Sequence, residues 1–150
     1  MLWPIMAKAP FSNPRTTIRI VLAVAFLLAG LLHLAVPGPF LAITPDWVPR
    51  PEAVIRFTGL AEIAGAIGLM TRRFRVAAGI GLALYSVCVY PANVHHAFAP
   101  DASLPQLGWA YHGPRLLLQP VIVWLCLWVS RAVDWPFAAE TKSASQAQGE

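Results

Sequence analysis

One acidic residue, Glu62, lies about ten positions inside an apolar run that we expect to form a helix over residues 53–70. At roughly 1.5 Å of rise per residue, it would lie about 15 Å from the start of that helix, near the midplane of a bilayer. An ionisable side chain at such a depth costs several kcal/mol unless it is paired, neutralised or hydrated, and such residues often mark proton or ligand pathways. Gly59 and Gly65 share its helical face. Small neighbours indicate that another helix approaches closely there, so we expect Glu62 to point at protein rather than lipid.

Five further polar residues fall near one end of the apolar runs. By depth alone we expect the helices to bring them together above Glu62, which defines a candidate polar pocket of His33, Glu62, Asn93, His96, Arg115 and Gln119. Arg115 and Gln119 are four residues apart and therefore share one helical face, which continues through Cys126. Trp124 and Trp128 fall on the opposite side, which we expect to face lipid.

Three interpretations of this cluster remain open. The first is a buried polar network, in which a pair between Glu62 and Arg115 or a bond from His33 holds the helices in register without doing chemistry. The second is a pocket for the head group of a quinone or a similar lipid-soluble molecule, in which His33 or His96 exchanges protons. Arg115 or Gln119 would then bind a carbonyl oxygen. The third, haem ligation by two histidines, has no CxxCH motif to support it.

Other sequence features assign little further chemistry. There is no Walker loop and no GxSxG or HExxH motif, so the catalytic residues stay unassigned and no metal site is predicted. Cys88 and Cys126 lie in apolar stretches without a neighbouring cysteine, which predicts buried packing rather than a disulfide or a zinc site. His112 stands beside Gly113 and Pro114 in an expected outer loop, where we predict a solvated turn residue.

The elements that must position these residues are membrane helices. Of the 150 residues, 57% are hydrophobic and only 12% are charged, too few polar groups to coat a water-soluble domain. The apolar runs predict an all-α, four-transmembrane-helix bundle with spans at about 18–36, 53–70, 74–92 and 114–133, in a single domain over residues 18–133. Residues 1–17 form a basic amino-terminal segment, and residues 134–150 form a tail that we expect to be partly disordered. The first run precedes no small-x-small cleavage site, so we expect a membrane helix there rather than a secretory signal.

The basic residues predict the orientation of the bundle. Of the 11 Lys and Arg residues, eight lie at the two chain ends and in the turn at residues 71–75, and three lie toward the opposite side. The excess of positive charge predicts that both termini are cytoplasmic. Because these residues flank apolar runs, the net charge of +4 does not indicate nucleic acid binding. The two outer loops carry Phe40, Trp47, Trp109 and Tyr111, which we expect to lie at the membrane interface.

The sequence also resembles a known family in several motifs at once. These are GLLHLAVPGPFLAITPDWVP with His33, GLAEIAG with Glu62, PAN with Asn93, and RLLLQ with Arg115 and Gln119. Together they resemble the DoxX-like family of small four-helix bacterial membrane proteins over nearly all of residues 26–130. The resemblance implies an inner-membrane protein that serves as a subunit beside thiosulfate-oxidising, quinone-reducing or thiol-redox partners.

We therefore predict an accessory or anchor subunit of a quinone-linked redox system, multi-pass in the bacterial cytoplasmic membrane, with a polar site at the outer end of the bundle. On this interpretation the chain is a non-catalytic subunit, its cofactor is a quinone, and its partners are the bilayer and a redox protein. Two alternatives stay open. One is a small-solute carrier that uses Glu62 as a proton site, which in a chain of 150 residues requires a homo-oligomer. The other is a purely structural membrane module.

Overall fold

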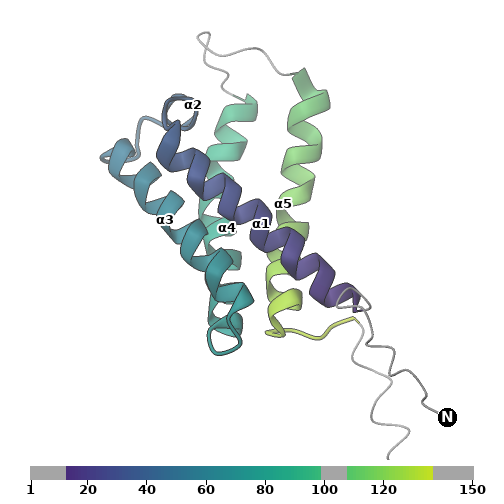
Figure 1. The fold of residues 1–150 in the computed structure, drawn as a ribbon. Helices are drawn as coiled ribbons and strands as arrows, with labels where there is room; N and C mark the ends of the chain where they lie inside the picture. Colours follow the sequence, from purple (N-terminus) through teal and green to yellow (C-terminus); the bar gives the residue numbers. More distant parts are fainter. Residues whose placement is uncertain (1–12, 99–107, 137–150) are drawn as a thin grey trace, which may run out of the picture.

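The computed structural model describes residues 13–98 and 108–136, and the long elements in this part of the chain are all helices (Figure 1). The helices of these residues are α1 (Pro14–Ala35), the short α2 (Gly38–Ala42), α3 (Pro51–Met70), α4 (Arg75–Phe98) and α5 (Gly108–Ser130). All of these except α2 are long and apolar enough to cross a membrane. The predicted all-α fold with four candidate membrane helices is confirmed.

Local sequence explains where α1 and α3 begin. The side chain of Asn13 accepts a hydrogen bond of 3.0 Å from the backbone N–H of Arg15, and Pro14 occupies the first turn of α1. A proline there forfeits no hydrogen bond, because the first helical N–H groups have no partner inside the helix. Pro51 begins α3 in the same way, directly after Arg50, whose backbone is left-handed with φ of 50°.

The fourth predicted span, at 114–133, is wrong in its bounds, since α5 runs from Gly108 to Ser130. Trp109 and Tyr111 accordingly lie in the first turns of α5 rather than in an outer loop. The third span, predicted at 74–92, extends to Phe98 and includes Pro91. A proline inside a helix removes one N–H donor, but membrane helices tolerate this where neighbouring side chains satisfy the freed backbone groups.

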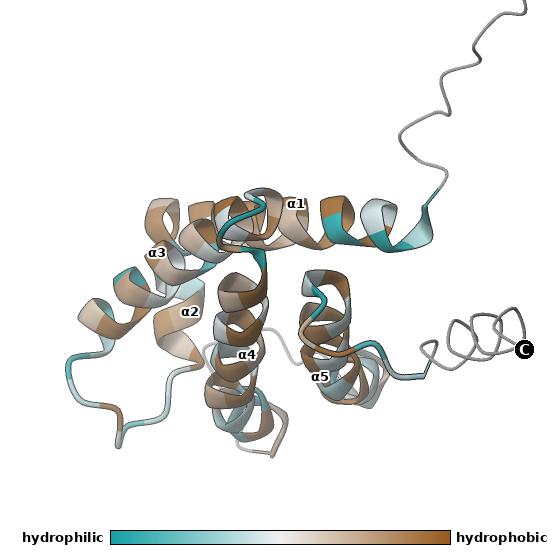
Figure 2. Ribbon diagram, turned by 90° about the horizontal axis from the view of Figure 1, so that it is seen from below, coloured by the Kyte–Doolittle hydropathy of each residue, from teal (hydrophilic) through white to brown (hydrophobic). Residues whose placement is uncertain are grey.

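The long helices form two antiparallel pairs, α1 with α3 and α4 with α5. In Figure 1, α1 crosses obliquely in front of α4 and α5, while α4 and α5 run alongside each other. The view along the bundle in Figure 2 shows α1 and α3 in one layer and α4 and α5 in the other, with hydrophobic colouring over most of the long helices. Helix α3 also contacts α4, and α2 contacts α3.

Glycines set how closely the helices approach. A Cβ atom built on Gly30 of α1 would lie 2.6 Å from the carbonyl oxygen of Gly59 in α3, and one built on Gly59 would lie 2.9 Å from the carbonyl oxygen of Gly30. A Cβ on Gly79 of α4 would collide with Ser130 of α5. Both helix pairs are therefore in backbone-to-backbone contact at these glycines, as is common where lipid supplies no hydrophobic drive for association.

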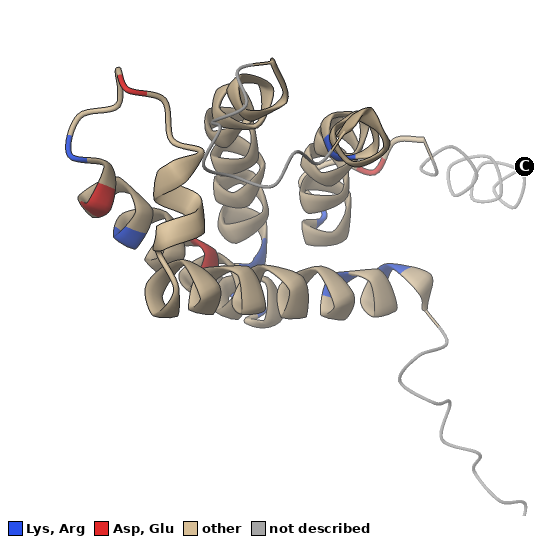
Figure 3. Cartoon of the chain, turned by 90° about the horizontal axis from the view of Figure 1, so that it is seen from above, with Lys and Arg blue, Asp and Glu red and all other residues tan. Residues whose placement is uncertain are grey.

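The packed core lies toward the end of the bundle where α1 begins. Leu69, Cys126 and Val129 are fully buried there, and Leu82 is nearly so. Large apolar side chains such as Leu117, which is 75% exposed, cover the outside of the bundle, as expected for a surface in contact with lipid. In Figure 3 the charged positions concentrate toward the helix ends, and most of the ribbon is uncharged.

Two predictions about side-chain burial are wrong. Cys88 is exposed, whereas its predicted environment was a packed interior; only Cys126 is buried. Trp128, predicted to face lipid, is 7% exposed. The start of α1 contributes to the burial of Trp128, because the guanidinium of Arg15 lies 4.7 Å from the centre of its indole ring.

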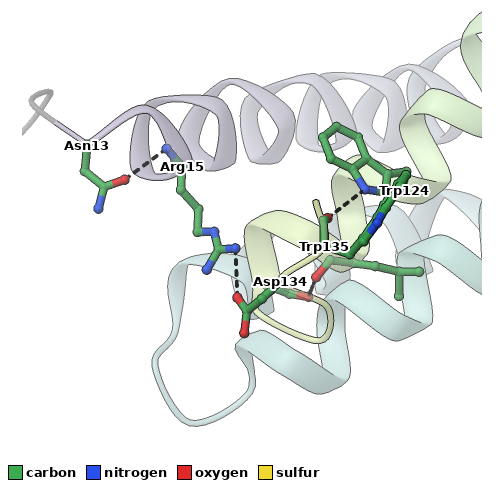
Figure 4. A network of polar contacts seen from close by, with 7 residues as sticks. Asn13, Arg15, Trp124, Asp134 and Trp135 are labelled. Carbon is green, nitrogen blue, oxygen red and sulfur yellow. Dashed lines mark hydrogen bonds and ion pairs between the residues drawn. The ribbon is translucent and has the colours of Figure 1, made fainter. Parts of the chain in front are cut away.

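The two described ends of the bundle meet at one side. Arg15, in the first turn of α1, forms an ion pair of 2.9 Å with Asp134 after α5, and the indole N–H of Trp124 donates to the carbonyl oxygen of Trp135 at 3.4 Å (Figure 4). This places Asn13 and the segment after α5 at the same end, although the side of the membrane on which they lie stays a prediction. Residues 1–12 and 137–150, which include most of the predicted amino-terminal segment and tail, lie outside the described residues.

Candidate functional site

A cavity of about 400 Å³ lies between the four long helices, in the half of the bundle that contains α2. Residues of α1, α3, α4 and α5 line it, and the segment from Phe40 to Val48 contributes to its wall. Five of the six candidate residues border the cavity: His33, Glu62, Asn93, Arg115 and Gln119. Its volume lies within the range of roughly 300–1,000 Å³ typical of small-molecule sites.

Glu62 forms the centre of one polar group in the cavity wall. Its side chain is buried, and the residue is only 4% exposed. The hydroxyl of Tyr85 donates a hydrogen bond of 2.8 Å to Oε1. The second oxygen, Oε2, lies 2.9 Å from Nδ1 of His33, within ion-pair distance, but it has no hydrogen-bond partner of acceptable geometry among the described residues. This carboxyl group therefore keeps acceptor capacity on the oxygen that faces His33.

The contacts of His33 define its tautomer. Its Nδ1 lies 2.9 Å from the backbone carbonyl oxygen of Ala29. A carbonyl oxygen can only accept, so we assign the proton to Nδ1, which makes Nε2 an acceptor in the neutral ring. The ring stacks on Phe40 of α2 at 3.8 Å between centroids, with 25° between the planes. This stacking couples the short helix to the acidic group in the cavity.

Arg115 forms the centre of a second polar group, between α4 and α5. Its Nη2 donates to Oδ1 of Asn93 at 2.6 Å, and its Nη1 lies 2.9 Å from Nδ1 of His96. Because a guanidinium can only donate, Nδ1 of His96 must accept, so His96 is neutral with its proton on Nε2. Unlike the other candidates, His96 does not border the cavity, and it acts on the site through Arg115.

Gln119 extends this second group to the backbone of α4. Its Oε1 accepts from Nδ2 of Asn93 at 3.3 Å, and its Nε2 donates to the carbonyl oxygen of Ser86 at 2.6 Å. Pro91 removes the N–H that would bond the carbonyl one residue beyond Ser86. The side chain of Gln119 thus ties α5 to the backbone of α4 one residue before the carbonyl that the proline leaves without its helical donor.

The predicted set of residues is brought together, but in a different pairing. Of the two contacts weighed for Glu62, the one from His33 is present, whereas Arg115 has Asn93 and His96 as its hydrogen-bonding partners instead. The two groups are separate networks on different walls of the cavity. One contains an acid, an imidazole and a phenol, and the other contains a cation, two carboxamides and the imidazole of His96.

Sequence reasoning missed Tyr85 and misassigned His112. Tyr85 is the direct partner of Glu62, and a hydroxyl within an otherwise apolar helix was the signal that could have identified it. His112 was predicted to be a solvated turn residue, but it lies in α5 and is 7% exposed. Its ring packs edge-on against His96, with 4.9 Å between centroids, because the helix begins before the histidine rather than after it.

Comparison with known proteins gives one family. The model of a domain of unknown function, DUF8561, matches residues 22–130, which is more than two thirds of the chain and includes every residue of the two polar groups. No curated protein and no solved structure matches the chain.

Proposed function

We propose that this chain, which belongs to the DUF8561 family, is a membrane subunit that binds the head group of a quinone in the cavity between its four long helices. The observation that supports this is that two walls of the cavity carry polar groups of different chemistry. A buried carboxyl group with acceptor capacity to spare lines the same cavity as a guanidinium held by two neighbouring side chains.

The chemistry of a quinone fits both walls. Its two carbonyl oxygens accept hydrogen bonds, and both acquire protons on reduction. Arg115 uses two of its N–H groups on Asn93 and His96, and a guanidinium carries five, so donors remain for a carbonyl oxygen. On the other wall, Oε2 of Glu62 has no hydrogen-bond partner among the described residues and can accept from the second oxygen once reduction has made it a hydroxyl group, and Glu62 and His33 can take up or release that proton.

The wider role follows from the resemblance to the DoxX-like family. We infer that the chain serves as an accessory or anchor subunit of a quinone-linked redox system in the bacterial cytoplasmic membrane, with both termini in the cytoplasm. It would hold the quinone for a redox partner protein. The charge distribution and the conjunction of motifs from His33 to Gln119 support this inference.

Quinone binding by the purified chain tests the proposal directly. A short-chain ubiquinone or menaquinone is titrated into the protein in neutral detergent, and quenching of tryptophan fluorescence is followed, since Trp47 lines the cavity. We expect saturable quenching by the wild type. Because hydrogen bonds to charged groups contribute about 1.5–3 kcal/mol, Arg115→Gln should raise the Kd of the quinone by about tenfold or more. Glu62→Gln should raise the Kd of the corresponding quinol by a similar factor in a parallel titration, because the carboxylate accepts only from a hydroxyl group.

Two substitutions in α3 serve as matched controls. Glu52 and Arg56 carry the same charges on exposed side chains and do not line the cavity, so Glu52→Gln and Arg56→Gln should leave Kd unchanged. Thermal unfolding of each variant shows whether it is folded. Absence of saturable quenching by the wild type, or equal Kd values for the cavity variants and the controls, would contradict the proposal. A loss of stability in Glu62→Gln without any quinone binding would instead favour a purely structural network.

A further inference from the structure

A group of arginines lies at the end of the bundle opposite the cavity, where the described ends of the chain meet. Arg19 of α1 lies close enough to Arg75, at the start of α4, and to Arg131, just after α5, for their like charges to act on it. The contact between Gly79 and Ser130 holds the start of α4 against the end of α5, which brings Arg75 and Arg131 to the same level. Three positive charges from three elements therefore meet at one place.

The acid at this end of the described chain, Asp134, is already paired with another arginine. Asp134 accepts from Nη2 of Arg15 at 2.9 Å (Figure 4). The guanidinium of Arg15 also lies over the ring of Trp128. The remaining acids of the described residues, Asp46, Glu52 and Glu62, lie in the loop after α2 or within α3, away from this end. No acid in the described part of the chain is thus left to compensate the three arginines.

The side chain of Arg19 indicates that a hydrogen-bond acceptor from outside the described chain binds here. Its Nε is buried and has no hydrogen-bond partner among the described residues. A buried donor without an acceptor destabilises the fold, and it does so more when the group is charged. Arg75 differs, since its Nε donates to the carbonyl oxygen of Leu69 at 3.3 Å, which anchors the side chain and leaves its terminal nitrogens available. Arg131 is exposed.

We propose that Arg19, Arg75 and Arg131 bind the phosphate of an anionic phospholipid head group. A phosphate supplies several acceptor oxygens and a negative charge, and the planar guanidinium can bind it through two parallel hydrogen bonds. The site lies at the ends of membrane helices, where basic clusters between helices bind such head groups. A simple topology signal needs only exposed charge, and it does not account for the buried, unpartnered nitrogen of Arg19.

Lipid binding to the purified full-length chain tests this site. Phosphatidylglycerol is titrated into the protein in neutral detergent, and native mass spectrometry measures the bound fraction, with phosphatidylcholine as the lipid without net charge. We expect phosphatidylglycerol to bind more tightly than phosphatidylcholine. Arg19→Gln should raise its Kd by about tenfold or more, because charge-assisted hydrogen bonds are lost together with the charge.

The matched control is Arg72→Gln, which removes the same charge from an exposed side chain at the same end of the bundle. A single charge near an anionic surface is worth about 1 kcal/mol, so this control should change Kd by no more than about fivefold. Equal effects of the two substitutions would overturn the proposal, because they would indicate a diffuse positive surface. Arg131→Gln provides a second test if Arg19→Gln does not fold. Thermal unfolding in the presence of phosphatidylglycerol or of inorganic phosphate shows which molecule supplies the bound phosphate. Protection by phosphatidylglycerol alone assigns a lipid, whereas equal protection by inorganic phosphate assigns the free anion and overturns the proposal.

Discussion

Substitution of Gly30 by alanine tests whether the approach of α1 to α3 positions the acidic group of the cavity. The new Cβ would lie 2.6 Å from the carbonyl oxygen of Gly59, 2.8 Å from Cγ1 of Ile63 and 3.1 Å from Cβ of Glu62. Ile63 can turn its side chain away, but a backbone carbonyl cannot. Since ordinary contact begins at 3.4 Å, the two helices must separate by about 0.8 Å at this point.

The same displacement reaches the candidate site. His33 is one turn beyond Gly30, and its Nδ1 lies 2.9 Å from Oε2 of Glu62. Moving the helices apart would lengthen this distance to about 3.7 Å and weaken the electrostatic attraction between the two groups. Overpacking of a close contact typically costs about 1–3 kcal/mol, so we expect Gly30→Ala to lower the free energy of unfolding by that amount.

Reversible unfolding in mixed micelles of neutral detergent and dodecyl sulfate, followed by circular dichroism, measures this change. Gly81→Ala is the matched control, because a Cβ at Gly81 of α4 has no atom within 4 Å. That control should be neutral or slightly stabilising, since alanine favours helix more than glycine does. If Gly30→Ala were as stable as the wild type, or if both variants lost the same stability, the glycine contact would not set the separation of α1 and α3.

Three further outcomes follow from individual contacts. Tyr85→Phe removes the donor to Oε1 of Glu62 and should lower the free energy of unfolding by about 1–3 kcal/mol, measured as above; an unchanged value would show that the hydrogen bond contributes nothing to stability. Cys88 is exposed and Cys126 is buried, so a maleimide applied in detergent should label Cys88→Ser far more slowly than Cys126→Ser, and equal labelling rates would contradict the assigned burial. Asp134→Asn breaks an ion pair whose acid is 58% exposed, and it should cost less than about 1 kcal/mol in the same unfolding assay, whereas a larger loss would indicate a buried role.

The fold could be predicted largely from local pattern. Apolar runs of membrane length predict the long helices. Pro37 marks the end of α1 and Pro51 marks the start of α3, because a helix end depends on the residues within a turn of it. Pro114 shows where this reasoning fails. Its prediction as a helix start is wrong, because α5 begins at Gly108 and contains it. The predicted span at 74–92 already included Pro91, but α4 continues beyond it to Phe98. A proline can stand in the first turn of a helix or at a tolerated interior position, and local sequence does not decide between the two.

The candidate site was likewise predictable from the sequence only in part. Sequence alone identified Glu62 and the polar residues toward one end of the bundle, because burying an ionisable group in an apolar segment is costly enough to be informative by itself. Only the tertiary structure decided that Glu62 contacts Tyr85 and His33 while Arg115 contacts Asn93 and His96. Depth along a helix follows from counting residues, but hydrogen-bond partners depend on the rotation and separation of neighbouring helices. Glycine contacts between distant segments set those quantities, and no local pattern contains them.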